Sequence, residues 1–294
     1  MHPFSTIALG SLAGMLVCCL PGETTAQNLF ASDTVHIYQF TPNGAYTRFA
    51  TSPGHITGLA VDSAGNLYYA DANYGTVVKV APDGTSTTFA TGLIQPFALA
   101  FNSMGDLFVS QAPGTGAGTG SILEFSPNGA RTVFATGLGM PAHMTFNSAG
   151  DLFVSDGAAL SIYRFAPNGT RSTFATITGQ GIGGLAFNSA GDLFLGAGGT
   201  TAYICRFAPD GTRITFASGL EHPIDLVFNQ SGDLFVSEFG TTPYILRFAP
   251  DGTRAAFTSA VAAQGLAFQV PEPSTLAIAA IWGFLFAFRR NVRR

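Results

Sequence analysis

The chain has little charge, few cysteines and a single tryptophan. Only 10% of its 294 residues are charged, and 13 lysines and arginines against 17 acids give a formal net charge of −4. This balance excludes a basic nucleic-acid-binding surface. With 47% hydrophobic residues and 27 phenylalanines, the chain is also not intrinsically disordered. Of its three cysteines, Cys18 and Cys19 are in an apolar N-terminal run, and Cys205 alone cannot form an intramolecular disulfide.

The N-terminus is typical of an export signal. Residues 7–20 are apolar, a length too short to span a membrane comfortably. The small residues Thr24 and Ala26 suit the −3 and −1 positions of a signal peptidase site. We therefore expect residues 1–26 to be a signal peptide cut after Ala26. A lipoprotein cut before Cys19 is disfavoured, because Cys18 rather than a small residue would precede it.

The C-terminus carries a second apolar segment. Residues 274–288 contain no charge, and a basic cluster follows them: Arg289, Arg290, Arg293 and Arg294. We expect a single transmembrane helix with this basic end on the cytoplasmic side. The alternative is a buried terminal helix.

The residues before that segment add a motif. Val270-Pro271-Glu272-Pro273-Ser274, then an apolar stretch and an arginine cluster, resembles the PEP-CTERM sorting signal, here residues 271–294. The resemblance implies a bacterial protein exported through signal peptidase and handled by an exosortase-type enzyme. It further implies a transient or retained anchor in the inner membrane, followed by the cell surface or the extracellular space.

Between the two ends, residues 27–270 are acidic. Without the four terminal arginines, nine of the 13 basic residues remain. Without Glu23 and Glu272, 15 of the 17 acidic residues remain, so the net charge of this part is near −6. Such a domain does not suit nucleic acid or anionic lipid as a partner.

This middle part repeats one unit. A Pro-Asn/Asp-Gly turn recurs every 40 to 45 residues, at Pro42, Pro82, Pro127, Pro167, Pro209 and Pro250. Each unit contains four short runs rich in Phe, Val, Ile and Thr, which we name strands A to D in chain order. No run has helical periodicity. Four antiparallel strands at this period predict an all-β fold, the β-propeller.

The ends of the repeat give the number of blades. Residues 28–33 match strand B, strands C and D follow, and the last unit stops after strand A at residues 265–268. We expect six blades, with one built from strands B, C and D of the N-terminus and strand A of the C-terminus. Such closure leaves no free sheet edge in the ring.

Units such as residues 219–238 resemble the six-bladed NHL-type, gluconolactonase-like and streptogramin-lyase-like propellers. That superfamily hosts unrelated chemistries, so the resemblance implies the fold more strongly than the activity. In the gluconolactonases, metal-binding acids and amides come partly from the position before strand A. Here that position holds no acid, and Gln264 is its only amide.

Candidate site residues are those that break the repeat on the face formed by the B–C and D–A connections. We expect strand A to begin at Gly58, Ala98, His143, Gly184, Asp225 and Gly265. Of these, His143 and Asp225 replace small residues. With His222, Asp156 and Glu238 they suit a divalent metal or a general base. The alternative is that the acids at the ends of strands B only accept loop N–H groups.

Three functions remain open. The first is a binding module for a glycan or an envelope protein, with no cofactor. The second is a hydrolase or lyase that uses Mg²⁺ or Ca²⁺ near His143 and Glu238. The third is a structural matrix protein without a discrete ligand.

Overall fold

The computed structural model describes residues 27–114, 118–178, 181–240 and 244–269. The expected signal peptide (1–26), and the residues from Val270 to Arg294 that hold the sorting motif, the apolar segment and the basic end, lie outside these ranges. The described residues contain strands and no helix. Accordingly, no helix among them is long and apolar enough to cross a membrane.

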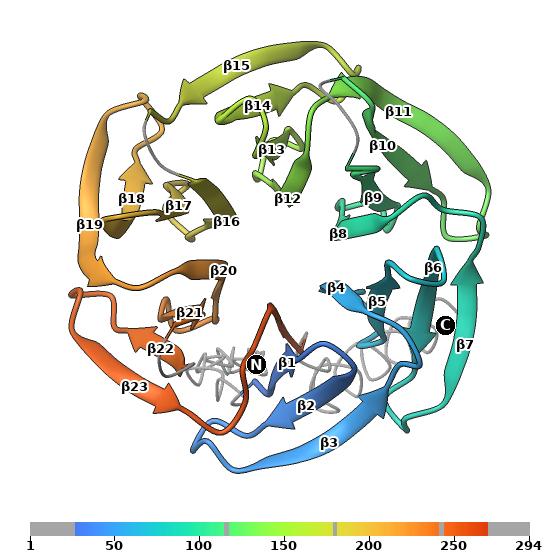
Figure 1. Cartoon of the computed structure of the whole chain (residues 1–294), viewed down its shortest axis with the longest axis horizontal. Coiled ribbons are helices and arrows are strands. Elements are labelled where there is room, and N and C mark those ends of the chain that lie inside the picture. The colour runs from blue at the N-terminus through green and yellow to red at the C-terminus, as the bar shows by residue number, and fades with distance from the viewer. Residues whose placement is uncertain (1–26, 115–117, 179–180, 241–243, 270–294) are drawn as a thin grey trace, which may run out of the picture.

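Six four-stranded antiparallel sheets form a ring (Figure 1). The first three blades contain the following strands: β24 (Gly265–Phe268), β1 (Leu29–Ser32), β2 (His36–Phe40) and β3 (Tyr46–Thr51); β4 (Ile56–Val61), β5 (Leu67–Asp71), β6 (Thr76–Val80) and β7 (Ser86–Ala90); β8 (Pro96–Phe101), β9 (Leu107–Gln111), β10 (Gly120–Phe125) and β11 (Arg131–Leu138).

The other three blades have the same order: β12 (Pro141–Phe146), β13 (Leu152–Asp156), β14 (Ser161–Phe165) and β15 (Arg171–Thr176); β16 (Gly181–Phe187), β17 (Leu193–Gly198), β18 (Ala202–Phe207) and β19 (Arg213–Leu220); β20 (Pro223–Phe228), β21 (Leu234–Glu238), β22 (Tyr244–Phe248) and β23 (Arg254–Thr258). We number these six sheets blades 1 to 6.

The predicted six-bladed propeller and its closure are confirmed. Blade 1 has the order β24-β1-β2-β3, so the C-terminal strand A pairs with the N-terminal strand B (Figure 1). The two are antiparallel, with Leu29 opposite Phe268 and Ser32 opposite Gly265. The ring is thus closed by hydrogen bonds between the two ends of the described chain.

The predicted start of strand A is wrong in five of the six blades. β4, β8, β12, β16 and β20 begin two or three residues earlier than expected. The reason is a register irregularity inside each strand, as between Pro141 and His143 or between Pro223 and Asp225. A β-bulge adds one residue to a strand and redirects the side chains beside it. His143 and Asp225 therefore directly follow a bulge.

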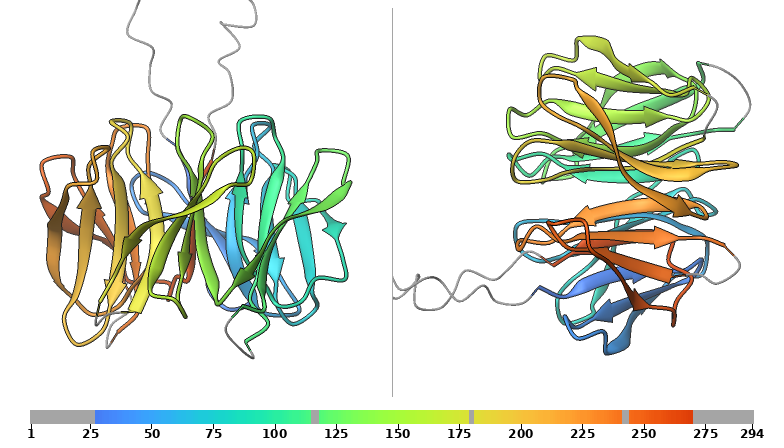
Figure 2. Two further views of the ribbon diagram at one scale, coloured as in Figure 1. Left: turned by 90° about the horizontal axis from the view of Figure 1, so that it is seen from above. Right: turned by 90° about the vertical axis from the view of Figure 1, so that its left-hand side faces the viewer.

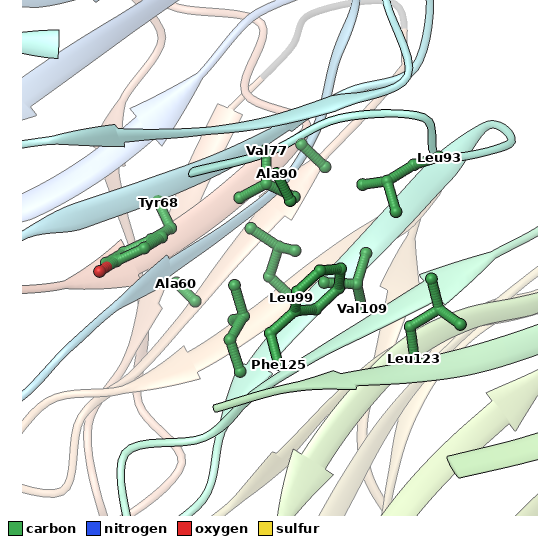
Figure 3. Packing of buried hydrophobic residues seen from close by; sticks show 11 residues of the cluster. Ala60, Tyr68, Val77, Ala90, Leu93, Leu99, Val109, Leu123 and Phe125 are labelled. Atoms are coloured by element: carbon green, nitrogen blue, oxygen red, sulfur yellow. The ribbon is translucent and has the colours of Figure 1, made fainter. Parts of the chain in front are cut away.

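Aromatic side chains pack the blades together. Phe153 of blade 4 meets Phe174 of the same blade and Phe187 of blade 5, with ring centroids 5.1 and 5.0 Å apart. Both pairs are edge-to-face, the arrangement that aromatic quadrupoles favour. The same triplet of rings recurs at most blade boundaries. Figure 3 shows the apolar cluster between blades 2 and 3, where Tyr68 and Val77 lie near Leu99, Val109 and Phe125.

The strands run between two faces of the ring (Figure 2). We call the face made by the A–B and C–D connections the turn face, and the face made by the B–C and D–A connections the loop face. On the turn face, Asn147 Oδ1 accepts the N–H groups of Ala149 and Asp151, and Asn147 Nδ2 donates to Asp151. Asn188 and Asn229 make equivalent bonds in blades 5 and 6. The turn face is thus built from one repeated turn.

Both ends of the described chain lie on the turn face. The N–H of Gln269, just after β24, donates to the carbonyl of Asn28 at 2.9 Å. The side chains of Gln27 and Asn28 also donate to Gln269. Strand β1 begins, and β24 ends, on the side of the A–B turns. Whatever precedes residue 27 or follows residue 269 therefore joins the ring on the turn face.

Candidate functional site

Strands A of all six blades line a central channel of about 380 Å³. Small residues allow these strands to approach one another. A Cβ on Gly184 would lie 2.7 Å from the Cα of Asp225, and one on Gly58 would lie 2.3 Å from the carbonyl oxygen of Phe97. Since real Cβ atoms do not come so close, glycine is required at both positions. His143 and Asp225 line the same channel.

The structure brings His143 and Asp225 into contact across blade 5, where Gly184 has no side chain to separate them. His143 Nδ1 lies 3.4 Å from Asp225 Oδ1, and both side chains are more than four-fifths buried. The residues are fixed by equivalent bonds, since the His143 and Asp225 N–H groups donate to Ser155 Oγ and Ser237 Oγ at 3.1 and 3.0 Å. The bulge, the serine and the small residue between them together set this geometry.

Asp225 has more than one partner. Its Oδ1 accepts the N–H of Leu226, and its Oδ2 accepts the N–H of Leu266 on β24, both at 2.9 Å. One carboxylate therefore joins blade 6 to the strand that closes the ring. Asp225 thus accepts two backbone N–H groups while it contacts the His143 ring.

The His143 ring lines the channel and contacts both Asp225 and Phe97. Its Nδ1 faces Asp225 Oδ1, and no described residue forms a hydrogen bond with its Nε2. The edge of the ring contacts Phe97, with centroids 6.1 Å apart. A His–Asp pair of this type can accept or donate a proton, or supply one metal ligand.

Asp156 lies at the end of β13 on the loop face, and both oxygens of its carboxylate accept backbone N–H groups. Its two oxygens accept the N–H groups of Gly139 and Met140 at 2.7 and 2.9 Å, and those of Ala158 and Ala159 at 3.2 Å. The carboxylate is buried, with 1% of the residue exposed. It thereby joins the D–A loop that leads into blade 4 to the B–C loop of that blade.

Glu238 and His222 lie together in blade 6 and do not line the channel that holds His143 and Asp225. Glu238, buried at the end of β21, accepts the N–H of Glu221, and the N–H of Phe239 donates to the His222 carbonyl. The exposed His222 ring lies against Gly198, where an added Cβ would come within 2.5 Å of its Nδ1. Within residues 27–269, excluding the gaps noted above, no three His, Cys, Asp or Glu side chains are grouped to hold a metal ion.

The structure also separates charge between the two faces. All nine lysines and arginines of residues 27–269 lie within two residues of the turn-face end of a strand C or D. Three of them pair with buried turn-face aspartates, as in Arg164–Asp151 at 2.7 Å, Arg206–Asp192 at 3.1 Å and Arg247–Asp233 at 2.8 Å. The remaining acids of that half balance its other bases.

The loop-face half contains six acids and no lysine or arginine. These acids are Asp33, Asp71, Asp156, Glu221, Asp225 and Glu238. The net charge of −6 of the described ring thus lies at its loop face. A count of charges by strand position in the sequence could have found this pattern.

Asp33 is the one loop-face acid with a clearly lowered pKa among the described residues. Partial burial on its own would raise the pKa of Asp33, but hydrogen bonds from the Val35 and His36 N–H groups outweigh it and hold the pKa below its ordinary value. Those two donors lie 2.8 and 2.7 Å from Asp33 Oδ1.

Cys205 lies far from this chemistry, in strand C of blade 5. Its residue is fully buried, and burial raises the pKa of its thiol to about 11. A thiol that stays protonated at neutral pH is a poor nucleophile.

Comparison with known proteins identifies the C-terminal segment and the fold. Residues 269–294 match the PEP-CTERM protein-sorting motif. No curated protein matches the chain. A chain of a nidogen–laminin complex superposes with a TM-score of 0.72 at 18% identity, covering 83% of this chain and 98% of that one.

Two enzymes are also similar in structure. Streptogramin B lyase gives a TM-score of 0.63 at 16% identity, covering 82% of this chain and 83% of that one. A gluconolactonase from Xanthomonas campestris gives 0.60 at 16% identity, covering 80% and 84%. At these identities the likeness concerns the fold alone. The sorting motif implies export, membrane-associated sorting and processing by exosortase-type machinery. The chain is a six-bladed β-propeller, with streptogramin-lyase and gluconolactonase propellers among its structural neighbours, and it ends in a PEP-CTERM protein-sorting motif.

Proposed function

We propose that this protein is an exported binding module that displays its loop face to a partner at the cell surface or in the extracellular matrix. The sorting motif supports the location. The contrast between a repeated turn face and a loop face that differs from blade to blade supports the binding role, since function tends to reside in variable loops on a rigid scaffold.

The observation that carries this proposal is the exposure of large apolar side chains on the loop face. Tyr74, Ile94, Met140 and Phe239 are 62%, 60%, 46% and 56% exposed. All four lie in B–C or D–A loops. Folding gains nothing from such exposure, and aromatic and methionine side chains are enriched where proteins meet their partners.

Photo-cross-linking in the producing cells tests the proposal. A photoreactive phenylalanine analogue is placed at Tyr74 or Phe239 in the full chain, and at Met104 or Tyr46 as matched controls. The controls are also exposed, at 76% and 47%, but lie on a turn and on an outer strand. We expect discrete adducts from the loop-face positions only. No adduct, or equal adducts from all four positions, would favour a structural matrix role.

The His143–Asp225 pair favours one second candidate, a hydrolase or lyase that works in the channel. The enclosed pair, with Nε2 directed to no described residue, has the arrangement of a general base and its orienting carboxylate. Binding of Mg²⁺ or Ca²⁺ to the full chain, measured by calorimetry beside His143→Ala and Glu238→Ala, tests its metal-dependent form. Tight binding lost in either variant would favour the enzyme over the binding module.

A further inference from the structure

The partner can be described more closely from three features of the loop face. The first is its charge. Six acids lie in the loop-face half of the strands, and all nine lysines and arginines of the described ring start from the other half. Asp156 and Asp225 show the contacts of such acids, which accept backbone N–H groups and, for Asp225, contact a histidine ring. The negative electrostatic potential of such a face attracts cationic groups and repels phosphates, sulfates and acidic polysaccharides.

The second feature is the placement of the apolar side chains around the ring. Tyr74 is in the B–C loop of blade 2, beside Ile94, because the Leu93 N–H donates to the Gly75 carbonyl. Met140 lies against Gly157 in the B–C loop of blade 4, and Phe239 is in that of blade 6. The three contact points thus lie on alternate blades and surround the channel mouth. A partner that contacts all three points must extend across the channel mouth.

The third feature is the direction in which the face points. The hydrogen bonds between Asn28 and Gln269 fix both ends of the ring on the turn face, and the sorting motif begins at residue 269. A membrane anchor in that segment would therefore hold the turn face toward the bilayer. The loop face would then be directed away from the lipid, toward whatever surrounds the cell.

We propose that the loop face docks a protein whose contact region combines lysine or arginine with apolar side chains, placed over the channel mouth. This rests on the proposed binding function. Isoleucine and methionine among the four exposed residues suit apolar side chains of a protein better than the polar faces of a sugar. The excess of acids in the loop-face half of the described strands favours a partner with positive charge.

The experiment screens the full chain in lipid nanodiscs against two probes in parallel. One is a displayed library of random dodecapeptides, and the other is an array of neutral and acidic polysaccharides. Selected peptides are then measured against two pairs of variants. Phe239→Ser is paired with Met104→Ser, and Thr200→Lys with Ser103→Lys. Thr200 is exposed on the loop face and Ser103 on the turn face, so each pair makes the same chemical change on opposite faces.

We expect enriched peptides rich in lysine or arginine and in apolar residues. Their affinity should fall about tenfold in Phe239→Ser and about threefold in Thr200→Lys, with no change in the two turn-face variants. Binding of neutral polysaccharides to the loop face, without basic peptides, would overturn the inference and leave the binding function standing. Enrichment of neither probe would overturn both. Equal losses in the turn-face variants would place the contact elsewhere and also contradict the inference.

Discussion

Acidic residues have different partners on the two faces of this ring. On the turn face, Asp192 is held by Asn188 and Arg206, and the same three-residue arrangement recurs in the neighbouring blades. On the loop face, Asp156 accepts only backbone N–H groups and Asp225 meets a histidine. Where charge is balanced, the repeat is preserved. Where charge is unbalanced, the blades differ, and Tyr74, Ile94, Met140 and Phe239 are exposed in the loops.

The largest effect is expected in the packing that supports both faces. Phe194 is 4% exposed and meets Phe216 and Phe228 with ring centroids 5.0 Å from each. Phe194→Ala should lower the free energy of unfolding by about 3–5 kcal/mol, because it leaves a cavity between blades 5 and 6. Denaturant unfolding measures this. A loss below about 1 kcal/mol would show that the blades do not depend on one another through these rings.

A smaller effect is expected from a turn-face carboxylate. Asp233→Ala leaves the Arg247 guanidinium and the Asn229 amide without their acceptor, so stability should fall by about 1–2 kcal/mol. The estimate is modest because the Arg247 side chain is half exposed. Since Asp233 lies on the turn face, binding of a partner to the loop face should not change. A loss of binding at unchanged stability would contradict the division between the faces.

Removing the Asp225 carboxylate should affect stability mainly at the closing strand β24. Asp225→Ala removes the acceptor for the Leu266 N–H on β24, so the cost is about 1 kcal/mol. Hydrogen exchange should speed up at Leu266 and its neighbours on β24. His143→Ala is the matched variant, since it empties the same channel but keeps this bond. Equal acceleration in both would mean that the carboxylate does not secure the closing strand.

The smallest effect is a dependence of stability on pH at Asp33. Because its pKa in the folded chain lies below the ordinary value near 3.8, Asp33 contributes stability above that value and loses it as the pH falls through the folded pKa. Asp33→Asn should therefore narrow the difference in stability between pH 5 and pH 3, two conditions chosen to bracket that value. An unchanged difference would show that Val35 and His36 do not favour the ionised form.

Most of the fold could be predicted because the sequence repeats one blade unit. The spacing from Pro42 to Pro250 gives six units, and the incomplete units at the two ends require β24 to pair with β1. The start of strand A could not be predicted, because a bulge changes the register without changing the composition. The extra residue is alanine at Ala142 and isoleucine at Ile224, and neither type marks a bulge.

The site could be predicted only in part. His143 and Asp225 were identified because they break a position of the repeat, and both lie in the channel as that position requires. Sequence reasoning gathered Asp156, His222 and Glu238 with them, but the channel pair lies on strands A and these three lie at strand ends and loops. Repeat position gives the height of a residue along the ring axis. It does not give the distance of its side chain from that axis.

The central claim, that the net charge of the ring lies on one face, can be measured without a ligand. Cationic and anionic paramagnetic cosolutes are added in turn to the full chain, and relaxation is read at backbone amides. We predict that amides of the B–C and D–A loops, such as those of Tyr74 and Thr200, relax faster with the cation than with the anion. Amides of the turns, such as those of Ser103 and Gly169, should respond equally to both. Equal responses on both faces would contradict the account.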